Sequence, residues 1–179
     1  MVKKVLIAAA VAASVGSINA WAGAVGTTLN VSATVSNNCL IAAPSTLAFG
    51  AYDPVSANAA TGADVSGSQT LAVTCTKSST GVNVELNDGG NFSTPNRRLV
   101  SGLNFLNYEL YKPAAVGAAA GCTTTRWGTV AGTQSLAVAS TDFTTATSAV
   151  SLKVCGTIPK GQDAATGSYT DAITVTVNF

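Results

Sequence analysis

The side chains that most often perform catalysis are scarce in this chain. There is no histidine, so neither a Ser-His nor a Cys-His nucleophile pair can form. No G-x-S-x-G nucleophile elbow occurs, and the eight carboxylates are spread singly, so no local pair suggests general acid–base work. Glycine-rich pieces such as Asp88-Gly89-Gly90 lack phosphate-loop spacing and are typical of hairpin turns. We therefore expect a protein that is not an enzyme and binds no cofactor.

Cysteine is the remaining reactive side chain, and four are present: Cys39, Cys75, Cys122 and Cys155. The C-x-x-C spacing of metal sites is missing, and no histidine is available to complete a ligand set. In an exported chain, an even number of cysteines predicts disulfides, and four allow three connectivities. Pairing in chain order would close two loops of similar length, each contributing roughly 3–4 kcal/mol of stability. We expect structural disulfides and no metal.

The first 22 residues predict that the chain is exported. Lys3-Lys4 is a short positive segment, Val5–Val15 is apolar, and Ala20-Trp21-Ala22 supplies an A-x-A cleavage site. Together they form the pattern of a secretory signal peptide. The apolar run is shorter than the stretch of about 20 residues that spans a bilayer. We expect cleavage after Ala22 and no membrane insertion of the mature chain.

Charge is sparse in this chain, at 9% of residues. Without Lys3 and Lys4, seven basic side chains face eight acidic ones, and they offer no patch for nucleic acid or anionic lipid. The one adjacent basic pair, Arg97-Arg98, is expected in a solvated loop. A surface with so little charge gives only weak repulsion between molecules and so favours association, which suits a protein that assembles.

Short runs of alternating polarity, separated by turn residues, fill the mature chain. Four internal runs place apolar side chains at every second position: Leu71–Cys75, Val82–Leu86, Leu103–Tyr111 and Val150–Val154. This period is that of a β-strand with one buried face. The Ala-rich patch Ala114–Gly121 follows a proline and contains two glycines, which favours a loop. Many short strands with frequent turns predict an all-β sandwich or barrel.

Both ends of the mature chain alternate as well. In the N-terminal arm, residues 23–36, one face carries Val25, Thr27, Leu29, Val31, Ala33 and Val35. In the C-terminal segment, one face carries Ile173, Val175, Val177 and Phe179. The pattern alone leaves two interpretations open. The ends are the first and last strands of a closed sandwich, or one is a strand to donate and the other borders an unfilled groove.

From Cys155 the sequence reads C-G-T-I-P-K-G-Q, then G-S-Y-T-D and an alternating strand that ends at Phe179. Further segments, in the same order along the chain, are Phe49–Pro54, Leu71–Cys75, Leu106–Tyr111 and Trp127-Gly128. Together these resemble the spore coat protein U domain family, which includes the pilins of archaic chaperone–usher pili, such as Csu-type subunits. The family's closing pattern falls on Gly156, Ile158, Pro159, Gly161, Gln162, Gly167, Tyr169, Asp171 and Phe179.

Cys155 departs from that pattern, because an aromatic residue is expected there in many relatives. With Cys122 it suggests a second disulfide that not every relative has, beside Cys39–Cys75. The resemblance implies an incomplete immunoglobulin-like β-sandwich that lacks its last strand. In such subunits a hydrophobic groove borders the C-terminal strand and is filled temporarily by a periplasmic chaperone. The N-terminal arm of the next subunit then replaces the chaperone strand at the outer-membrane usher.

Carried onto this chain, the resemblance makes residues 1–22 the signal peptide, 23–36 the donor-strand arm and 37–179 the pilin-type sandwich. The apolar face of the arm supplies the donor side chains, and the apolar face of the C-terminal segment supplies the acceptor-groove edge. We expect a structural subunit of a surface fibre that polymerises with copies of itself or related pilins. Its partners are then a periplasmic chaperone and an outer-membrane usher, and its role is adhesion or biofilm formation.

Two alternatives use the same sandwich. One is a secreted spore-coat or matrix-type protein, and the other is a tip adhesin that acts as a binding module. A terminal subunit would not need to donate a strand, so the long alternating arm favours the shaft of the fibre. Trp127 and Tyr111 are expected to pack in the core or at an edge rather than to bind a ligand.

Overall fold

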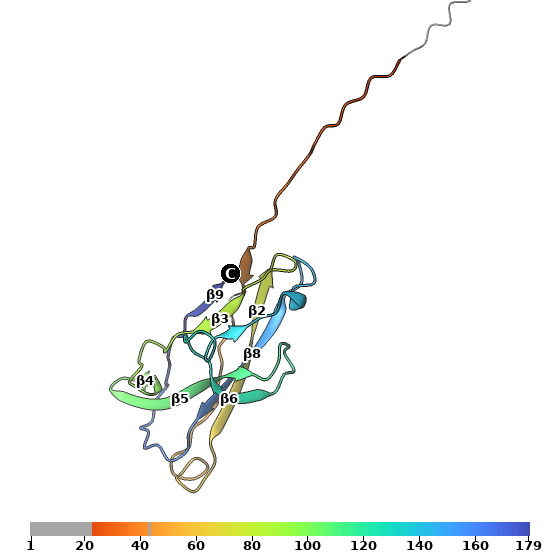
Figure 1. Cartoon of the computed structure of the whole chain (residues 1–179). Helices are drawn as coiled ribbons and strands as arrows, with labels where there is room; N and C mark the ends of the chain where they lie inside the picture. The colour runs from red at the N-terminus through yellow and green to blue at the C-terminus, as the bar shows by residue number, and fades with distance from the viewer. Residues whose placement is uncertain (1–22, 43) are drawn as a thin grey trace, which may run out of the picture. The chain divides into compact units, whose positions relative to one another are not determined.

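The computed structural model describes residues 23–42 and 44–179 (Figure 1). The predicted signal peptide, residues 1–22, lies outside the described residues. Residues 23–34 and Val35–Phe179 belong to separate units. Residues 23–38 are exposed and belong to no strand or helix, so the alternating arm forms no strand within the single chain. An isolated strand has no partner for its backbone N–H and C=O groups, and water satisfies them instead.

Nine strands and one short 3₁₀ helix make up the described part of the larger unit. The elements are β1 Cys39–Ile41, β2 Val65–Cys75, β3 Asn83–Leu86, β4 Arg97–Ser101, β5 Asn104–Pro113, β6 Cys122–Arg126, β7 Leu136–Ala137, η1 Ser140–Asp142, β8 Val150–Ile158 and β9 Val175–Asn178. One sheet has the order β1-β2-β8-β5-β4, with β6 also paired to β5, and the other has the order β7-β3-β9. The strand pairs in both sheets are antiparallel.

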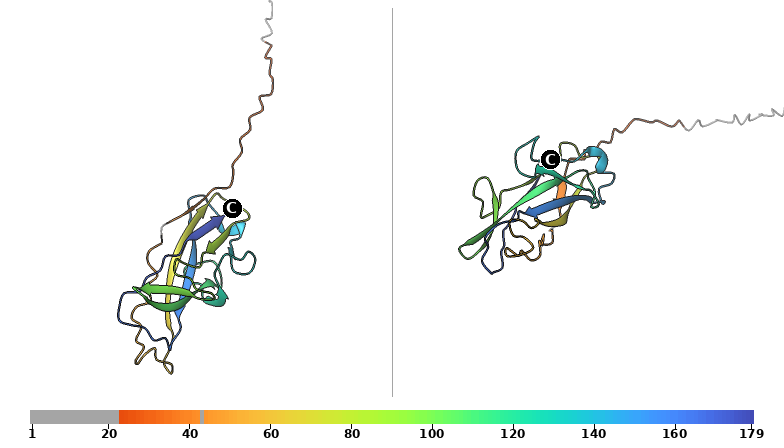
Figure 2. Two further views of the ribbon diagram at one scale, coloured as in Figure 1. Left: turned by 90° about the vertical axis from the view of Figure 1, so that its left-hand side faces the viewer. Right: turned by 90° about the horizontal axis from the view of Figure 1, so that it is seen from below.

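The two sheets share one apolar core. In the large sheet β2 and β8 run side by side, from Val65 opposite Ile158 to Val73 opposite Val150 (Figures 1 and 2). Alternate side chains of β2, β3, β5 and β8 point inward and are almost completely buried, and Trp127 is fully buried among them. The prediction of an all-β chain is confirmed, and two sheets packed through a common core are the arrangement of a β-sandwich.

Strands β2, β3, β5 and β8 fall within or overlap the four internal runs that alternate in the sequence, so the four predicted strands are confirmed. In β5 the buried face carries Leu106, Tyr108 and Leu110, whereas Leu103 and Phe105 are exposed and do not belong to it. Residues 114–121 lie outside the named strands, as expected for a loop. The C-terminal strand is shorter than its pattern, because only Val175–Asn178 pairs with β3. Among the described residues, no helix is long and apolar enough to cross a membrane.

Both disulfides are present, and they join the cysteines in chain order. Cys39–Cys75 connects β1 to β2, with the two Cα atoms 4.1 Å apart. Cys122–Cys155 connects β6 to β8, with a Cα separation of 5.9 Å. The first bond lies where the chain enters the sandwich from the arm, and the second ties a short outer strand to the centre of the large sheet.

Candidate functional site: an apolar groove beside the last strand

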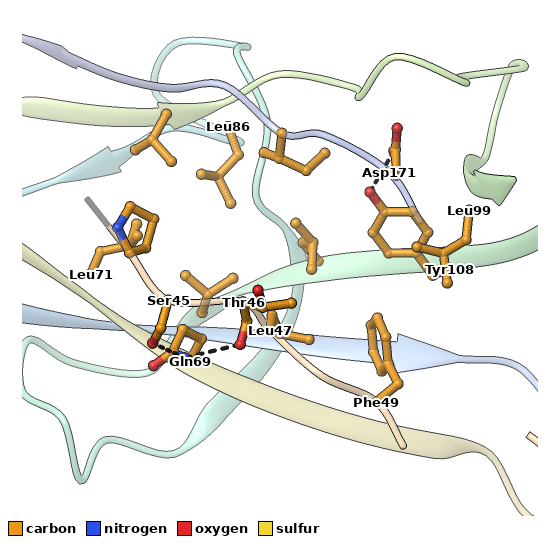
Figure 3. Close-up of a pocket in the computed structure, with 15 residues that line it drawn as sticks. Ser45, Thr46, Leu47, Phe49, Gln69, Leu71, Leu86, Leu99, Tyr108 and Asp171 are labelled. Carbon is orange, nitrogen blue, oxygen red and sulfur yellow. Dashed lines mark hydrogen bonds between the residues drawn. The ribbon is translucent and has the colours of Figure 1, made fainter. Parts of the chain in front are cut away.

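A groove with a volume of about 260 Å³ opens between the C-terminal segment and the segment Pro44–Phe49 (Figure 3). The two walls come from opposite ends of the chain, and neither is part of the large sheet. The floor is formed by core side chains from five strands: Leu71, Leu86, Leu99, Tyr108, Leu110 and Val154. Most of these side chains are almost fully buried, so the groove leads directly into the hydrophobic core.

The first wall consists of Asp171, Ile173 and Val175. Ile173, Val175 and Val177 are half-buried and pack on the core, whereas the residues between them are exposed. This is the alternation that the sequence predicts for an edge facing a groove. Phe179, the fourth predicted edge residue, is 54% exposed and does not line the cavity.

The outer edge of β9 has no strand partner among the described residues, because β9 is the last strand of its sheet. On the inner edge, Asn87 N donates to Thr174 O at 3.0 Å. Hydrogen-bonded and non-hydrogen-bonded pairs alternate along an antiparallel ladder. The backbone N–H and C=O groups of Val175 and Val177 therefore point away from β3, toward the groove side.

The second wall, Pro44–Phe49, was not predicted from the sequence. It forms no backbone–backbone hydrogen bond with any described residue. Its polar tether is Gln69, whose side-chain amide donates to Ser45 Oγ at 2.7 Å and to Thr46 O at 3.1 Å (Figure 3). Leu47 and Phe49 are half-buried against the core. Two apolar residues in alternation, Leu47 and Phe49, are the only signal that the sequence offers for this wall.

One end of the groove is polar. Tyr108 donates its phenolic proton to Asp171 Oδ2 at 2.7 Å (Figure 3). Asp171 Oδ1 accepts from Gly90 N and from the Asn91 amide. Burial, and then the hydrogen bond to the Asp171 carboxylate, raise the pKa of Tyr108 well above its ordinary range. The phenol thus stays protonated, and the carboxylate anchors the start of the C-terminal segment to the turn after β3.

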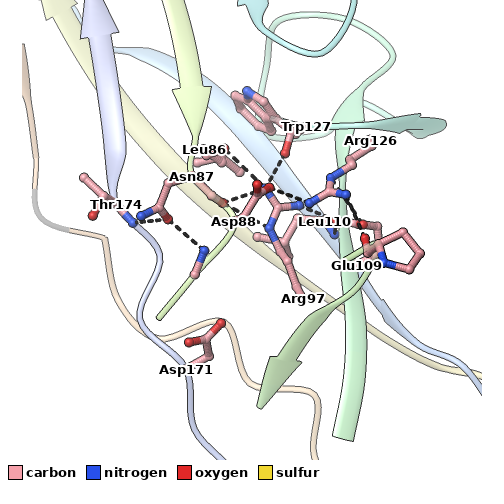
Figure 4. A network of polar contacts seen from close by, with 12 residues as sticks. Leu86, Asn87, Asp88, Arg97, Glu109, Leu110, Arg126, Trp127, Asp171 and Thr174 are labelled. Carbon is pink, nitrogen blue, oxygen red and sulfur yellow. Dashed lines mark hydrogen bonds and ion pairs between the residues drawn. The ribbon is translucent and has the colours of Figure 1, made fainter. Parts of the chain in front are cut away.

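Arg97 stabilises the region next to the groove. Its position shows that the expectation of a solvated loop at Arg97-Arg98 is wrong. Both arginines are in β4, and Arg97 is 0% exposed. Its guanidinium is ion-paired with Glu109 and donates to the carbonyls of Leu86, Asn87 and Trp127 (Figure 4). Burial is tolerated because the charge is paired and its hydrogen-bonding groups have partners.

This network continues to the groove through Asn87. The Asn87 backbone bonds with Arg97 and Thr174, and its side-chain oxygen accepts from Thr174 N at 2.9 Å (Figure 4). Thr174 lies between Ile173 and Val175, which line the first wall. Arg126 completes the charge balance by contacting Asp88 and Glu109. The network therefore positions the end of β3 and, through it, the first wall.

The predicted donor side chains lie outside this network. Val25, Leu29, Val31 and Val35 are 80–101% exposed, and Thr27 and Ala33 are also exposed. Apolar side chains so completely exposed are unusual in series, because each loses the free energy that burial would provide. The arm therefore carries a series of exposed, mostly apolar side chains at alternate positions.

The segments that carry the family resemblance have structural roles. Tyr52 Oη donates to Pro159 O at 3.1 Å and accepts from Gln162 N at 2.9 Å. The Gln162 side chain bonds with the backbone of Asn107 in both directions, which ties the loop after β8 to β5. These bonds join distant parts of the chain around the sandwich and contain no arrangement for bond-breaking chemistry.

The described part of the chain holds no cluster of three or more His, Cys, Asp or Glu side chains that could bind a metal. The ionic groups that do gather, Arg97, Arg126, Asp88 and Glu109, are paired with one another. The chemistry that the site offers is thus an apolar surface beside unpaired backbone groups, which suits the binding of an extended peptide.

Comparison with known proteins shows the family to which the chain belongs. Residues 26–176 match the family model described as Spore Coat Protein U domain. A curated relative, Protein U of Myxococcus xanthus, is 33% identical over a 190-residue alignment that covers 99% of this chain and 98% of the relative.

A chain in the crystal structure of the CsuC–CsuE chaperone–tip adhesion subunit pre-assembly complex, from the archaic chaperone–usher Csu pili of Acinetobacter baumannii, is also similar. It matches with a TM-score of 0.49 and 22% identity, and the match covers 82% of this chain and 40% of that chain. The family match covers residues 26–176, which include most of the predicted arm and nearly the whole sandwich. This chain belongs to the spore coat protein U domain family.

Proposed function

We propose that this protein is a structural subunit of a chaperone–usher surface fibre, in which the N-terminal arm of one subunit fills the groove of the next. The observation that carries the proposal is the groove itself. It leads to core side chains, and on one side it is bordered by the edge of β9, which has no strand partner among the described residues. Membership in the spore coat protein U domain family, which includes the pilins of archaic chaperone–usher pili, supports the same role.

An added strand would satisfy both needs of the groove at once. Its backbone would pair with the outward-facing groups of Val175 and Val177, and its alternate side chains would cover the floor. Leu29, Val31, Ala33 and Val35 have the required spacing, and Val25 and Thr27 extend the set. At about 25 cal/mol per Å² of apolar area, burying four such side chains contributes on the order of 5–8 kcal/mol.

The connectivity then makes a fibre. An arm that belongs to one subunit and binds the next makes a heterologous contact, which propagates as an open filament rather than closing into a ring. A subunit with an open apolar groove would aggregate during export. We therefore expect two partners: a periplasmic chaperone that covers the groove, and an outer-membrane usher at which the arm of the next subunit replaces the chaperone. The expected location is the cell surface, and adhesion or biofilm formation is the expected use.

The test compares two neighbouring positions of the arm, Val31 and Ser32, which lie on opposite faces. The chain is exported with its chaperone and usher, and unheated gel electrophoresis reports denaturation-resistant multimers. Val31→Asp should abolish the ladder, because a carboxylate would enter the apolar groove. Ser32→Asp should leave it intact, because that side chain would face solvent.

A deletion of residues 23–36 provides the second arm of this experiment. We expect the truncated chain to remain bound to the chaperone, since it keeps its groove but has nothing to donate. Electron microscopy should show fibres for the unaltered protein and for Ser32→Asp, and none for the truncated chain. Equal assembly of both Asp variants, or a truncated chain that is a folded, chaperone-free monomer, would refute the proposal.

A coat or matrix layer is the second candidate. The near full-length similarity to Protein U, in a family described by the name of a spore coat protein, favours it. The same strand exchange would build it, and only the destination would differ. Microscopy of the cell surface separates the two, because a fibre projects from the envelope whereas a coat covers it evenly.

A further inference from the structure

Two glycines lie directly beneath the second wall of the groove. Gly67 in β2 and Gly156 in β8 are register partners at the centre of the large sheet. A Cβ atom at Gly156 would lie 2.7 Å from Cζ of Phe49 and 2.8 Å from its Cε1. A Cβ at Gly67 would lie 3.0 Å from Leu47 Cδ2 and 3.2 Å from Phe49 Cδ1. The Phe49 ring thus rests in a notch that only two adjacent glycines can provide.

Backbone conformation does not require glycine at either position. The glycines with positive φ among the described residues lie elsewhere in the chain, so an alanine could adopt the backbone of Gly67 or Gly156. Glycine within a strand costs about 0.5–1 kcal/mol relative to alanine, and its usual reason there is close approach of another group. We therefore interpret this glycine pair as leaving room for the second wall.

We propose that the Gly67–Gly156 notch sets the width of the strand-binding groove, by keeping the Phe49 ring out of the path of the incoming strand. This inference rests on the proposed function and identifies the residues that decide which strand the groove accepts. The sheet closes off one side of the ring, and Tyr108 contacts it edge to face, with 5.9 Å between ring centroids. The side of the ring that remains open faces the groove, which Phe49 lines (Figure 3).

The size of the effect follows from the contact distances. Carbon atoms pack best at about 3.5–4.0 Å, so a methyl group on Gly156 would push the ring by roughly 1 Å toward the groove. Pro44–Phe49 forms no backbone–backbone hydrogen bond with any described residue and is tethered by the Gln69 side chain, so the wall can yield to this push. A narrower groove would then disfavour bulky donor side chains such as Leu29.

The experiment measures two quantities for the exported full-length chain: the yield of denaturation-resistant multimers, and binding of a synthetic peptide of residues 23–36 to the purified protein. Gly156→Ala should weaken peptide binding roughly tenfold, as overpacking of a fitted apolar site does. The matched control is Gly121→Ala, since a Cβ at Gly121 would meet nothing within 4 Å and its φ is not positive. That control should bind and assemble like the unaltered chain.

A compensating change distinguishes displacement of the Phe49 ring from a general loss of stability as the cause of weaker binding. Gly156→Ala combined with Phe49→Leu removes the ring that the methyl group displaces, so binding should recover. If Gly156→Ala fails to fold, Gly67→Ala gives a comparison with milder contacts, because its Cβ would lie 3.0 Å from Leu47 Cδ2 and 3.2 Å from Phe49 Cδ1.

The outcomes distinguish the inference from the proposed function. If the unaltered chain neither assembles nor binds the peptide, both are overturned. If the unaltered chain does both, and Gly156→Ala binds equally well, the notch is overturned while strand exchange stands. If Gly156→Ala binds weakly and the Phe49→Leu combination does not recover, the displaced ring is not the cause and the notch is again overturned.

Discussion

Replacing Arg97 by alanine should destabilise the sandwich far more than the same change at Arg98. The two arginines are adjacent in β4, but their side chains differ in burial and in partners. Arg97 is fully buried and bonds to Glu109 and to three backbone carbonyls. Arg98 is half-buried, donates to Asn91 O at 2.8 Å and lies 4.1 Å from the centre of the Phe105 ring.

The magnitudes follow from these contacts. Removing one partner of a buried ion pair costs about 3–5 kcal/mol, because the other charge is left without compensation. The alanine at position 98 loses one hydrogen bond and one cation–π contact, about 1–2 kcal/mol together. Arg97→Lys should fall between the two, since an ammonium group keeps the charge but cannot reach Glu109 and all three carbonyls.

The assay is urea unfolding of the purified mature chain with its disulfides intact. Trp127 is the natural probe, because it is fully buried and the other tryptophan, Trp21, lies within the predicted signal peptide. With a slope of about 2 kcal/mol per M, the midpoint for Arg97→Ala should fall by roughly 2 M. Far-UV circular dichroism should give the same midpoint if unfolding is two-state. Equal midpoints for Arg97→Ala and Arg98→Ala would refute the structural role of this network.

The remaining predictions concern Tyr108 and the two disulfides. Because the pKa of Tyr108 is raised in the folded state by burial and by its hydrogen bond to a carboxylate, its contribution to stability is complete below about pH 10, the ordinary value, and falls as the pH rises further. The free energy of unfolding of the unaltered chain should therefore decline more steeply between pH 9 and 11 than that of Tyr108→Phe, and parallel curves would contradict this. Paired Cys→Ser replacement of either disulfide should cost about 4 kcal/mol by the loop-entropy estimate, since Cys39–Cys75 and Cys122–Cys155 span 36 and 33 residues. The two losses should add in urea unfolding, because the loops do not overlap, and a loss near zero for either pair would show that its loop is already ordered in the unfolded chain.

Much of the fold was predictable because its information is local. Alternation with a period of two identifies a strand with one buried face, so the strands β2, β3, β5 and β8 could be located from residue order alone. The apolar face of the C-terminal segment was predictable for the same reason, and Ile173 and Val175 do line the groove. Four cysteines in a chain with a predicted export signal likewise predicted disulfides without any knowledge of the fold.

The groove was only half predictable, since its second wall gives little local signal. Pro44–Phe49 is too short to show a clear period, and it takes its place by resting on Gly67 and Gly156. Those two glycines are 89 positions apart in the sequence and become neighbours only when β2 pairs with β8. In sequence they are indistinguishable from ordinary turn glycines.

The amino-acid sequence by itself determined the strands β2, β3, β5 and β8, the four cysteines available for disulfides and the alternating apolar residues of the arm, because each depends on neighbours along the chain. The tertiary structure alone decided that Arg97 is buried and that the groove reaches the core. The guanidinium is stable inside only because Glu109 and carbonyls from β3 and Trp127 converge on it. Such convergence depends on which distant segments meet in space, and residue order does not state it.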